Sequence, residues 1–224
     1  ALTKAAAEKK ADVIIIGGGD GSAAAAAAIL QNGDKALAIL PAGTMNLFAR
    51  SLGIPLGLDA AVQAFATGRI REVDMASANG RPFVHQFSLG MHAKMVGLRD
   101  RMEFGSRLGK IRASVTAAYH TIMRPPSMRV SLRMDGTEIL TKTTGLGITN
   151  NLFGEGYRLP YAADPAGGVL GIYITVARQP LHLVKFFFNM LRGRWRSNDQ
   201  VEIHEAREVT VEVTADGVSA RGRG

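Results

Sequence analysis

The amino-acid sequence predicts an α/β domain with a partial doubly wound sheet, followed by a second domain rich in β-strands. Apolar runs short enough to be strands alternate with helical segments over the first 70 residues, which is the pattern of parallel strands joined by helices. Beyond residue 127 most segments are strand-like instead. The composition, 46% hydrophobic and 21% charged residues, is that of a folded protein. We place residues 1–74 in the first domain and residues 75–224 in the second.

The first domain is expected to alternate helices and strands. Residues 13–16 are a β-branched apolar run typical of a buried parallel strand, and the alanines that follow favour a helix because alanine is the best helix former. The expected helices and strands are, in order, 1–11, 13–16, 22–31, 36–40, 44–54 and 58–68. A doubly wound sheet usually begins on a strand, so a helix in first place predicts that an N-terminal βα unit is missing from this chain.

The second domain follows a hairpin over 71–90, where Asn79-Gly80 is a strong two-residue turn signal. A helical stretch over 91–123 ends before Pro125 and Pro126, which cannot continue a helix. One further helix is expected at 181–193. The expected strands are 127–136, 137–150, 168–177, 200–206 and 208–215.

The charge distribution predicts an anionic partner. The net charge is +8, and residues 94–133 hold nine Lys or Arg against two acids. The segment 181–196, with three phenylalanines and three arginines, is a second candidate for contact with a membrane surface. A solvated helix face and a core helix with a basic end stay open as alternatives. The chain has no cysteine, which excludes disulfides and thiolate metal sites and fits a cytoplasmic protein. No apolar run approaches the roughly 20 residues of a membrane span.

A glycine loop follows the first strand. The segment VIIIGGGDGS, residues 13–22, runs through four glycines into a helix. It only half fits the G-x-G-x-x-G dinucleotide fingerprint and lacks the lysine of a Walker A loop. What remains is a tight loop and a helix N-terminus, which bind anions through backbone N–H groups and the helix dipole. A second loop, PAGTMN at 41–46, follows the next strand, and two such loops at neighbouring parallel strands form a ligand crevice.

Asp20 lies in the middle of the first glycine loop. A carboxylate beside phosphates is repelled unless a cation lies between them, and Mg²⁺ bridging a carboxylate and nucleotide phosphates is the usual arrangement. We therefore predict that Asp20 acts through Mg²⁺. The alternative is that Asp20 or Ser22 caps the following helix, as both residue types do well.

These loops resemble those of a known family. GGGDGS followed by LPAGTMNLFARSLGIP is similar to the G-G-D-G-T and P-L-G-T-x-N-D-x-A-R motifs of the diacylglycerol kinase catalytic domain family, which includes bacterial lipid kinases and sphingosine kinases. FVHQFSLGMHAKMV (83–96) and TNNLFGEGYRLPYAADPAGGVLGIYIT (149–175) resemble two later segments of that family. The resemblance implies an NAD-kinase-like α/β nucleotide domain and a β-sandwich domain, with ATP and Mg²⁺ in the cleft between them.

The resemblance also implies a reaction and its residues. The γ-phosphoryl group of ATP would pass to a hydroxyl of diacylglycerol or a related lipid, in an enzyme attached peripherally to an anionic membrane surface. A homodimer is left open, and no nucleic acid is expected. By position, the nucleotide-binding residues are Gly18, Gly19, Asp20, Gly21 and Ser22 in the first loop and Gly43, Thr44 and Asn46 in the second. Asp20 is also the expected catalytic and metal-associated residue.

The sequence departs from the family pattern at several positions. Leu47 stands where the family commonly has Asp, and His85 and His92 stand where it commonly has Asn and Asp. Gly167 replaces an expected metal-associated Asp, for which Asp164 is the candidate stand-in. These departures favour either a divergent branch with another acceptor or an altered catalytic set.

The catalytic base is the least defined residue. The family takes it from a C-terminal Asp-Gly-Glu, whereas Asp216-Gly217 is followed here by Val218. Asp216 is therefore the candidate base, and we expect residues to be missing around this site. Two rival functions stay open: a soluble kinase of related fold acting on NAD, and a nucleotide- or lipid-binding protein that has lost catalysis.

Overall fold

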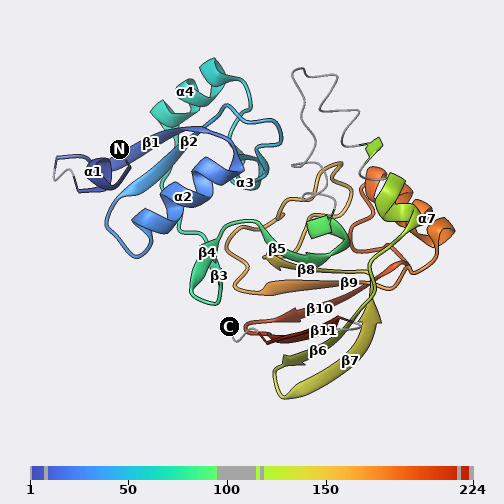
Figure 1. Ribbon diagram of the computed structural model, residues 1–224. Coiled ribbons are helices and arrows are strands. Elements are labelled where there is room, and N and C mark those ends of the chain that lie inside the picture. The colour runs from blue at the N-terminus through green and yellow to red at the C-terminus, as the bar shows by residue number, and fades with distance from the viewer. Residues whose placement is uncertain (1, 8–9, 95–114, 117–118, 216–217, 222–224) are drawn as a thin grey trace.

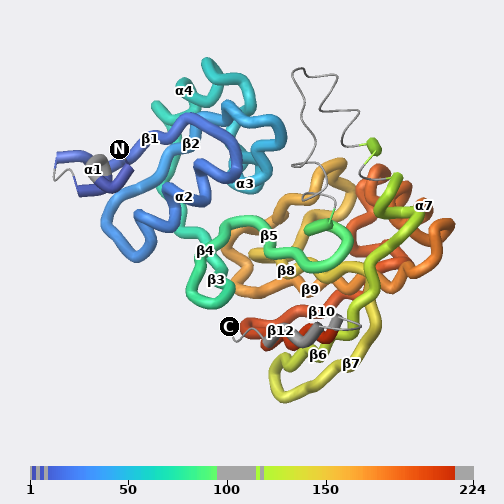
Figure 2. The backbone as a smooth tube through the Cα atoms, in the orientation of Figure 1, coloured from blue at the N-terminus to red at the C-terminus, as the bar shows by residue number. Residues whose placement is uncertain are grey.

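The computed structural model describes residues 2–7, 10–94, 115–116, 119–215 and 218–221. These residues form an α/β domain and a larger domain of two sheets, shown at upper left and lower right in Figure 1. Figure 2 shows the chain passing between them through the hairpin of β3 (Ala76–Ala78) and β4 (Arg81–Phe83). The predicted order, an α/β domain followed by a β-rich domain, is confirmed.

The first domain is built on the parallel strands β1 (Val13–Gly18) and β2 (Ala36–Pro41). Its helices are α1 (Leu2–Ala6), α2 (Asp20–Leu30), α3 (Leu47–Ser51) and α4 (Leu58–Thr67). Ala23 and Ala26 of α2 are buried, and Ala23 packs against Ile39 of β2. The buried core consists of Ala23, Ile39, Phe48, Ala49 and, from beyond β4, Val84.

Two expected helices are shorter in the structure. The helix expected over 44–54 is only α3, because Asn46 has a left-handed backbone (φ 51°) before it and Gly53 (φ 70°) after it. Of the helix expected over 1–11, the described residues form only α1. Most of the helical stretch expected over 91–123 lies outside the described residues.

The second domain is a sandwich of two four-stranded antiparallel sheets, with strand orders β10-β9-β8-β5 and β12-β11-β6-β7. Inward-facing side chains of both sheets, among them Leu132, Ile148 and Ile172, form one core. This confirms the β-sandwich. The strands are β5 (Gln86–Gly90), β6 (Met128–Met134), β7 (Thr137–Thr143), β8 (Gly145–Asn150), β9 (Leu170–Thr175), β10 (Val201–Ala206), β11 (Thr210–Ala215) and β12 (Val218–Arg221).

The prediction of a single strand over 137–150 is wrong. The chain forms β7 in one sheet and β8 in the other, and it crosses between them at Thr144. The Thr143 hydroxyl donates to the Thr175 carbonyl and the Thr144 hydroxyl to the Ala177 carbonyl, each at 2.8 Å. These bonds satisfy polar groups at a buried corner, which is why two threonines are tolerated there.

Two other expectations are confirmed. Asn79 and Gly80 form the β3–β4 turn with φ of 51° and 74°, as a type I′ turn requires. Helix α7 (Pro180–Leu191) matches the helix expected over 181–193, and its buried Leu183 and Phe186 pack with Met91 and Ala177. None of the described helices is both long and apolar enough to span a bilayer.

The sandwich core predicts a contrast between two leucines on neighbouring strands. Leu132 on β6 is 0% exposed, whereas Leu140 on β7 is 78% exposed. Leu132→Ala is expected to lower the free energy of unfolding by about 2–5 kcal/mol because it leaves a cavity. Leu140→Ala should change it by less than about 1 kcal/mol. Urea unfolding of both variants measures the difference, and equal losses would contradict the assignment of the core.

Candidate functional site

The two glycine loops meet at the carboxyl edge of the parallel strands. β1 and β2 end in register, with Gly18 opposite Pro41, so both loops begin at the same edge. A Cβ built on Gly43 would lie 2.4 Å from Gly19 Cα, and one built on Gly19 would lie 3.2 Å from Gly43 Cα. A side chain at 43 is therefore incompatible with this approach. The structure brings the predicted residues of both loops together.

Asn46 folds the second loop onto its own backbone. Its side-chain oxygen accepts a hydrogen bond from the Gly43 N–H at 2.9 Å, and its amide donates to the Pro41 and Gly43 carbonyls at 3.2 and 3.0 Å. Asn46 is buried and left-handed, a conformation that asparagine adopts more readily than most residues. Its observed contacts shape the loop, and direct contact with a nucleotide stays a prediction.

Asp20 joins the two loops. It is the first residue of α2, and its Oδ1 accepts a hydrogen bond from the Phe48 N–H at 2.9 Å. Phe48 lies in the first turn of α3, where backbone N–H groups have no partner inside the helix. Asp20 thus caps the neighbouring helix, while α2 itself begins at Gly19 without a side-chain cap. The expected alternative, a cap on the following helix α2, is therefore wrong, and the contact with α3 is compatible with a second role of Asp20 in the crevice.

The rim of the crevice is polar and open. Gly21, Ser22 and Thr44 are exposed. Gly21 and Ser22 belong to the first turn of α2, where backbone N–H groups have no partner inside the helix. Gly18 packs closely on the same turn, since a Cβ there would lie 2.6 Å from the Ser22 side chain. Exposed hydroxyls and unpaired N–H groups at a helix N-terminus are the donors that hold phosphate. The arrangement suits an anionic ligand lying across both loops.

Asp74 is a hydrogen-bonded connection between the domains. Its Oδ2 accepts from the Asn151 amide at 3.0 Å and the Gly168 N–H at 2.6 Å, and its carbonyl accepts from the Asn150 amide at 2.7 Å. The residues on either side of Asp74 pack against the α/β core. Sequence reasoning missed Asp74, because nothing distinguishes it locally from another acid in a connecting segment.

His85 lies beside the loops, directly before β5. Its carbonyl accepts the Asn150 N–H at 2.8 Å, and its imidazole stacks on Phe153 with ring centroids 5.6 Å apart. Burial lowers the pKa of His85 to about 4; the charge of Asp20 opposes this shift and His92 adds to it. His85 is therefore neutral at pH 7 and adds no charge to the crevice.

An apolar cavity of about 130 Å³ lies between β5, β8, β9 and α7. Its lining is mostly aliphatic and aromatic, with Phe186 and Met190 contributed by α7. β5 supplies polar groups, Gln86 and Ser88, which are hydrogen bonded at 2.8 Å, and His92 follows the strand. The segment 85–92 therefore begins beside the glycine loops, at His85, and ends at the lining of the cavity, at His92.

Of the remaining predicted acids, Asp164 is described by the structure and does not join Asp20 in a metal cluster. Asp164 is exposed, forms an ion pair with Arg71 at 2.7 Å and accepts the Ala166 N–H at 3.1 Å. Asp216 lies outside the described residues. Over the part of the chain that the structure describes, no group of three or more His, Asp or Glu side chains is arranged to hold a metal ion. Mg²⁺ needs less, since one carboxylate with substrate phosphates is a usual set, and Asp20 fits that requirement.

The fold and the loops define the class of protein: an α/β domain with two glycine loops at one edge of its sheet, joined to a β-sandwich. Residues 1–78 match the model of the diacylglycerol kinase catalytic domain, and residues 86–224 match the YegS C-terminal NAD kinase beta sandwich-like domain. The chain belongs to the YegS-like lipid kinase family. Kinases with this catalytic domain use ATP. The domain boundary at 74/75 stays a prediction.

Individual relatives agree with this assignment. The chain is 28% identical over 201 residues to "Probable lipid kinase YegS" of Salmonella gallinarum. This match covers 83% of this chain and 64% of that protein. It is 31% identical over 150 residues to "Probable lipid kinase YegS-like" of Yersinia enterocolitica, covering 65% and 49%. The chain thus spans less than two thirds of either relative. A crystal structure of a diacylglycerol kinase from Bacillus anthracis shares the fold, with a TM-score of 0.69 and 23% identity over 99% of this chain and 76% of that one.

The contact between the loops predicts a selective effect of adding one methyl group. Gly43→Ala places a Cβ 2.4 Å from Gly19 Cα and is expected to cost about 1–3 kcal/mol of unfolding free energy through overpacking. Gly21→Ala is the control, because nothing lies within 4 Å of its Cβ and alanine favours the helix by up to about 1 kcal/mol. Urea unfolding distinguishes the two. A Gly43→Ala protein as stable as wild type would contradict the contact.

The low pKa of His85 predicts acid sensitivity. The unfolded chain takes up a proton at His85 below about pH 6.5 and the folded chain only below about pH 4. The stability from neutral His85 is therefore complete above pH 6.5 and falls as the pH drops from 6.5 to 4, by about 2–3 kcal/mol at pH 4.5. His85→Gln removes this dependence. Urea unfolding of both proteins at pH 7.0 and 4.5 tests this prediction. If the wild type and His85→Gln lose the same free energy of unfolding at pH 4.5, the prediction is refuted.

Proposed function

We propose that this protein is an ATP-dependent lipid kinase, which binds ATP at the two glycine loops and transfers its γ-phosphoryl group to a hydroxyl of diacylglycerol or a related lipid. The observation that carries the proposal is the position of the segment 85–92. His85 lies close enough to the first glycine loop for the charge of Asp20 to act on its pKa, and Gln86, Ser88 and His92 line the apolar cavity. A phosphate site beside an apolar cavity suits an acceptor with a polar head and a hydrocarbon chain. Membership of the YegS-like lipid kinase family supports the same acceptor class.

The residues of the crevice have defined tasks in this proposal. Phosphoryl transfer requires positioning and charge stabilisation rather than covalent chemistry by the protein. The backbone N–H groups around Gly19, Gly21 and Gly43 would hold the phosphate oxygens. Asp20, fixed by the Phe48 N–H, would hold Mg²⁺, which supplies neutralisation of the phosphate charge when bound. Asp216 is the candidate to take the proton of the acceptor hydroxyl.

The acceptor is identified by phosphate transfer from γ-labelled ATP. Diacylglycerol in mixed micelles is expected to become labelled, and NAD is expected to remain unlabelled because a small polar acceptor makes no use of the apolar cavity. Labelling of NAD alone would favour the soluble kinase. Binding of ATP without transfer to any lipid would favour the binding protein, for which Leu47 in place of an acid is the specific observation.

Asp20→Asn separates the charge of Asp20 from its structural contact. The asparagine retains an oxygen for the Phe48 N–H, so the free energy of unfolding should change by less than about 1 kcal/mol, while phosphate transfer falls at least about 100-fold. Asp20→Ala should in addition lose about 1 kcal/mol of stability, because the Phe48 N–H is left without its acceptor. Asp34→Asn, at an exposed position, is the charge-matched control. Asp20→Asn with wild-type activity would rule out the metal role of Asp20.

A further inference from the structure

The outer face of α7 is unusually apolar. Four large side chains spaced three or four residues apart are exposed there: Leu181 (75%), Val184 (51%), Phe188 (53%) and Leu191 (76%). This spacing places them on one face of a helix. The inner face is apolar as well, since Leu183 is 0% and Phe186 7% exposed. A helix that is apolar on both faces is expected to have a partner on both.

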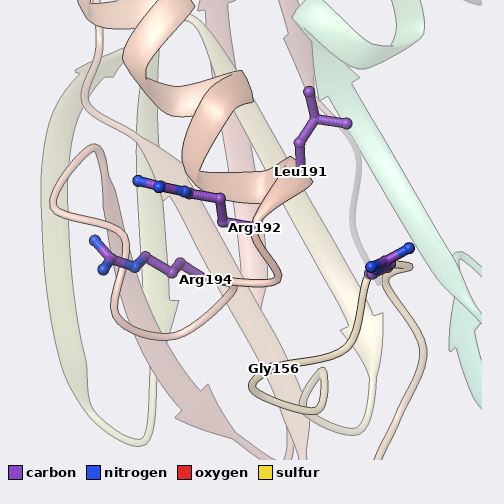
Figure 3. A pocket seen from close by; sticks show the side chains of 5 residues that line it. Gly156, Leu191, Arg192 and Arg194 are labelled. Carbon is purple, nitrogen blue, oxygen red and sulfur yellow. The ribbon is translucent and has the colours of Figure 1, made fainter.

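A basic hollow lies at the C-terminal end of this exposed row. It has a volume of about 640 Å³ and is lined by Gly156, Arg158, Leu191, Arg192 and Arg194. Figure 3 shows Arg192 and Arg194 extending from the chain just after the last turn of α7. Leu191, at the edge of the hollow, is also the last member of the apolar row.

The floor of the hollow is firmly built. The Gly156 N–H donates to the Gly193 carbonyl at 2.8 Å, and a Cβ on Gly193 would lie 2.8 Å from the Gly156 carbonyl carbon. Gly193 is left-handed, with φ of 75°. The buried Trp195 donates its indole N–H to the Tyr157 carbonyl. Arg192 and Arg194 therefore project from a turn that is held against the loop of Gly156 and Tyr157, which carries Arg158.

The arginines of the hollow lack acidic partners within the described chain, unlike other cations on this side of the molecule. Lys185 pairs with Asp199, and Arg196 lies 3.9 Å from Glu205. The guanidinium of Arg192 lies 4.7 Å from the centre of the Phe188 ring, which connects the charged hollow to the apolar row. Guanidinium groups bind phosphate through paired, directional hydrogen bonds.

We propose that the outer face of α7 docks on an anionic phospholipid bilayer, with the apolar row at the headgroup boundary and lipid phosphates in the arginine hollow. An apolar stripe beside arginines is the pattern of a helix that lies in the membrane interface. The inner face of the same helix lines the apolar cavity, so docking brings that cavity to the membrane. The inference rests on the proposed lipid acceptor for its purpose, and its test requires no catalysis.

The arginine hollow is tested by co-sedimentation with vesicles of equal parts phosphatidylglycerol and phosphatidylcholine. The triple variant Arg158→Gln, Arg192→Gln, Arg194→Gln is expected to bind on the order of 100-fold more weakly, from about fivefold per arginine. A control triple removes the same charge from the exposed side chains of Arg81, Arg133 and Arg207, and it should bind within about threefold of wild type. If both triple variants lose vesicle binding equally, the attraction depends on net charge alone, and the proposed role of the hollow is overturned.

The apolar row is tested by Leu181→Gln, Leu191→Gln, which is expected to lower vesicle binding at least about tenfold because two exposed leucines no longer enter the interface. The matched control is Ile70→Gln, Leu140→Gln, at two positions that are each 78% exposed. Trp195 is the single tryptophan, so its fluorescence verifies the fold of every variant. Vesicle binding unchanged in the α7 double variant would overturn the proposal.

Two further outcomes separate this inference from its rivals. If the wild-type protein is a dimer that the α7 double variant dissociates, while neither protein binds vesicles, the face is a contact between copies and the proposal fails. Transfer of phosphate to a short-chain, water-soluble diacylglycerol should be unchanged by the arginine triple. If the wild-type protein does not transfer phosphate to this lipid, the proposed kinase activity is contradicted. The vesicle experiment then still tests the docking of α7.

Discussion

The contact between Gly19 and Gly43 is the constraint on which the site depends. Parallel strands in register end at a common edge, but a common edge does not bring two loops into contact. The loops can touch because Gly19 and Gly43 have no side chain. The hydrogen bond from the Phe48 N–H to Asp20 then holds the starts of α2 and α3 together. One short acid thus has a structural contact and a place in the crevice, which explains its position among glycines.

Asp74 has a comparable role between the domains. A carboxylate that accepts several N–H groups makes stronger hydrogen bonds than a neutral acceptor, and its donors Asn151 and Gly168 come from the sandwich. Asn150 joins the segment 85–92 to this connection, since its amide donates to the Asp74 carbonyl and its N–H to the His85 carbonyl, which places His85 next to the contact between the domains. The burial of His85, and with it the low pKa, follows from that placement.

Helix α7 belongs to two environments. Its inner face closes an apolar cavity against the sandwich, and its outer face presents a second apolar row that ends in arginines. A soluble helix that needed only to cover the sandwich would gain nothing from exposed leucines. Under the docking proposed for α7, the two faces would connect a membrane surface with the apolar cavity and with the segment 85–92 beside the glycine loops.

Local patterns in the sequence were enough for the order of the two domains, the Asn79-Gly80 turn and the two glycine loops, because each depends on neighbouring residues. They could not locate the crossing at Thr144, since 137–150 is strand-like throughout and only the packing of two sheets decides where the chain changes sheet. The partners of Asp20, Asp74 and His85 are 28 to 94 residues away where hydrogen bonds join them. The sequence by itself therefore determined the order of the two domains, the hairpin turn and the position of the two glycine loops. Only the tertiary structure decided which distant groups meet, because such contacts arise from packing and leave no periodic trace along the chain.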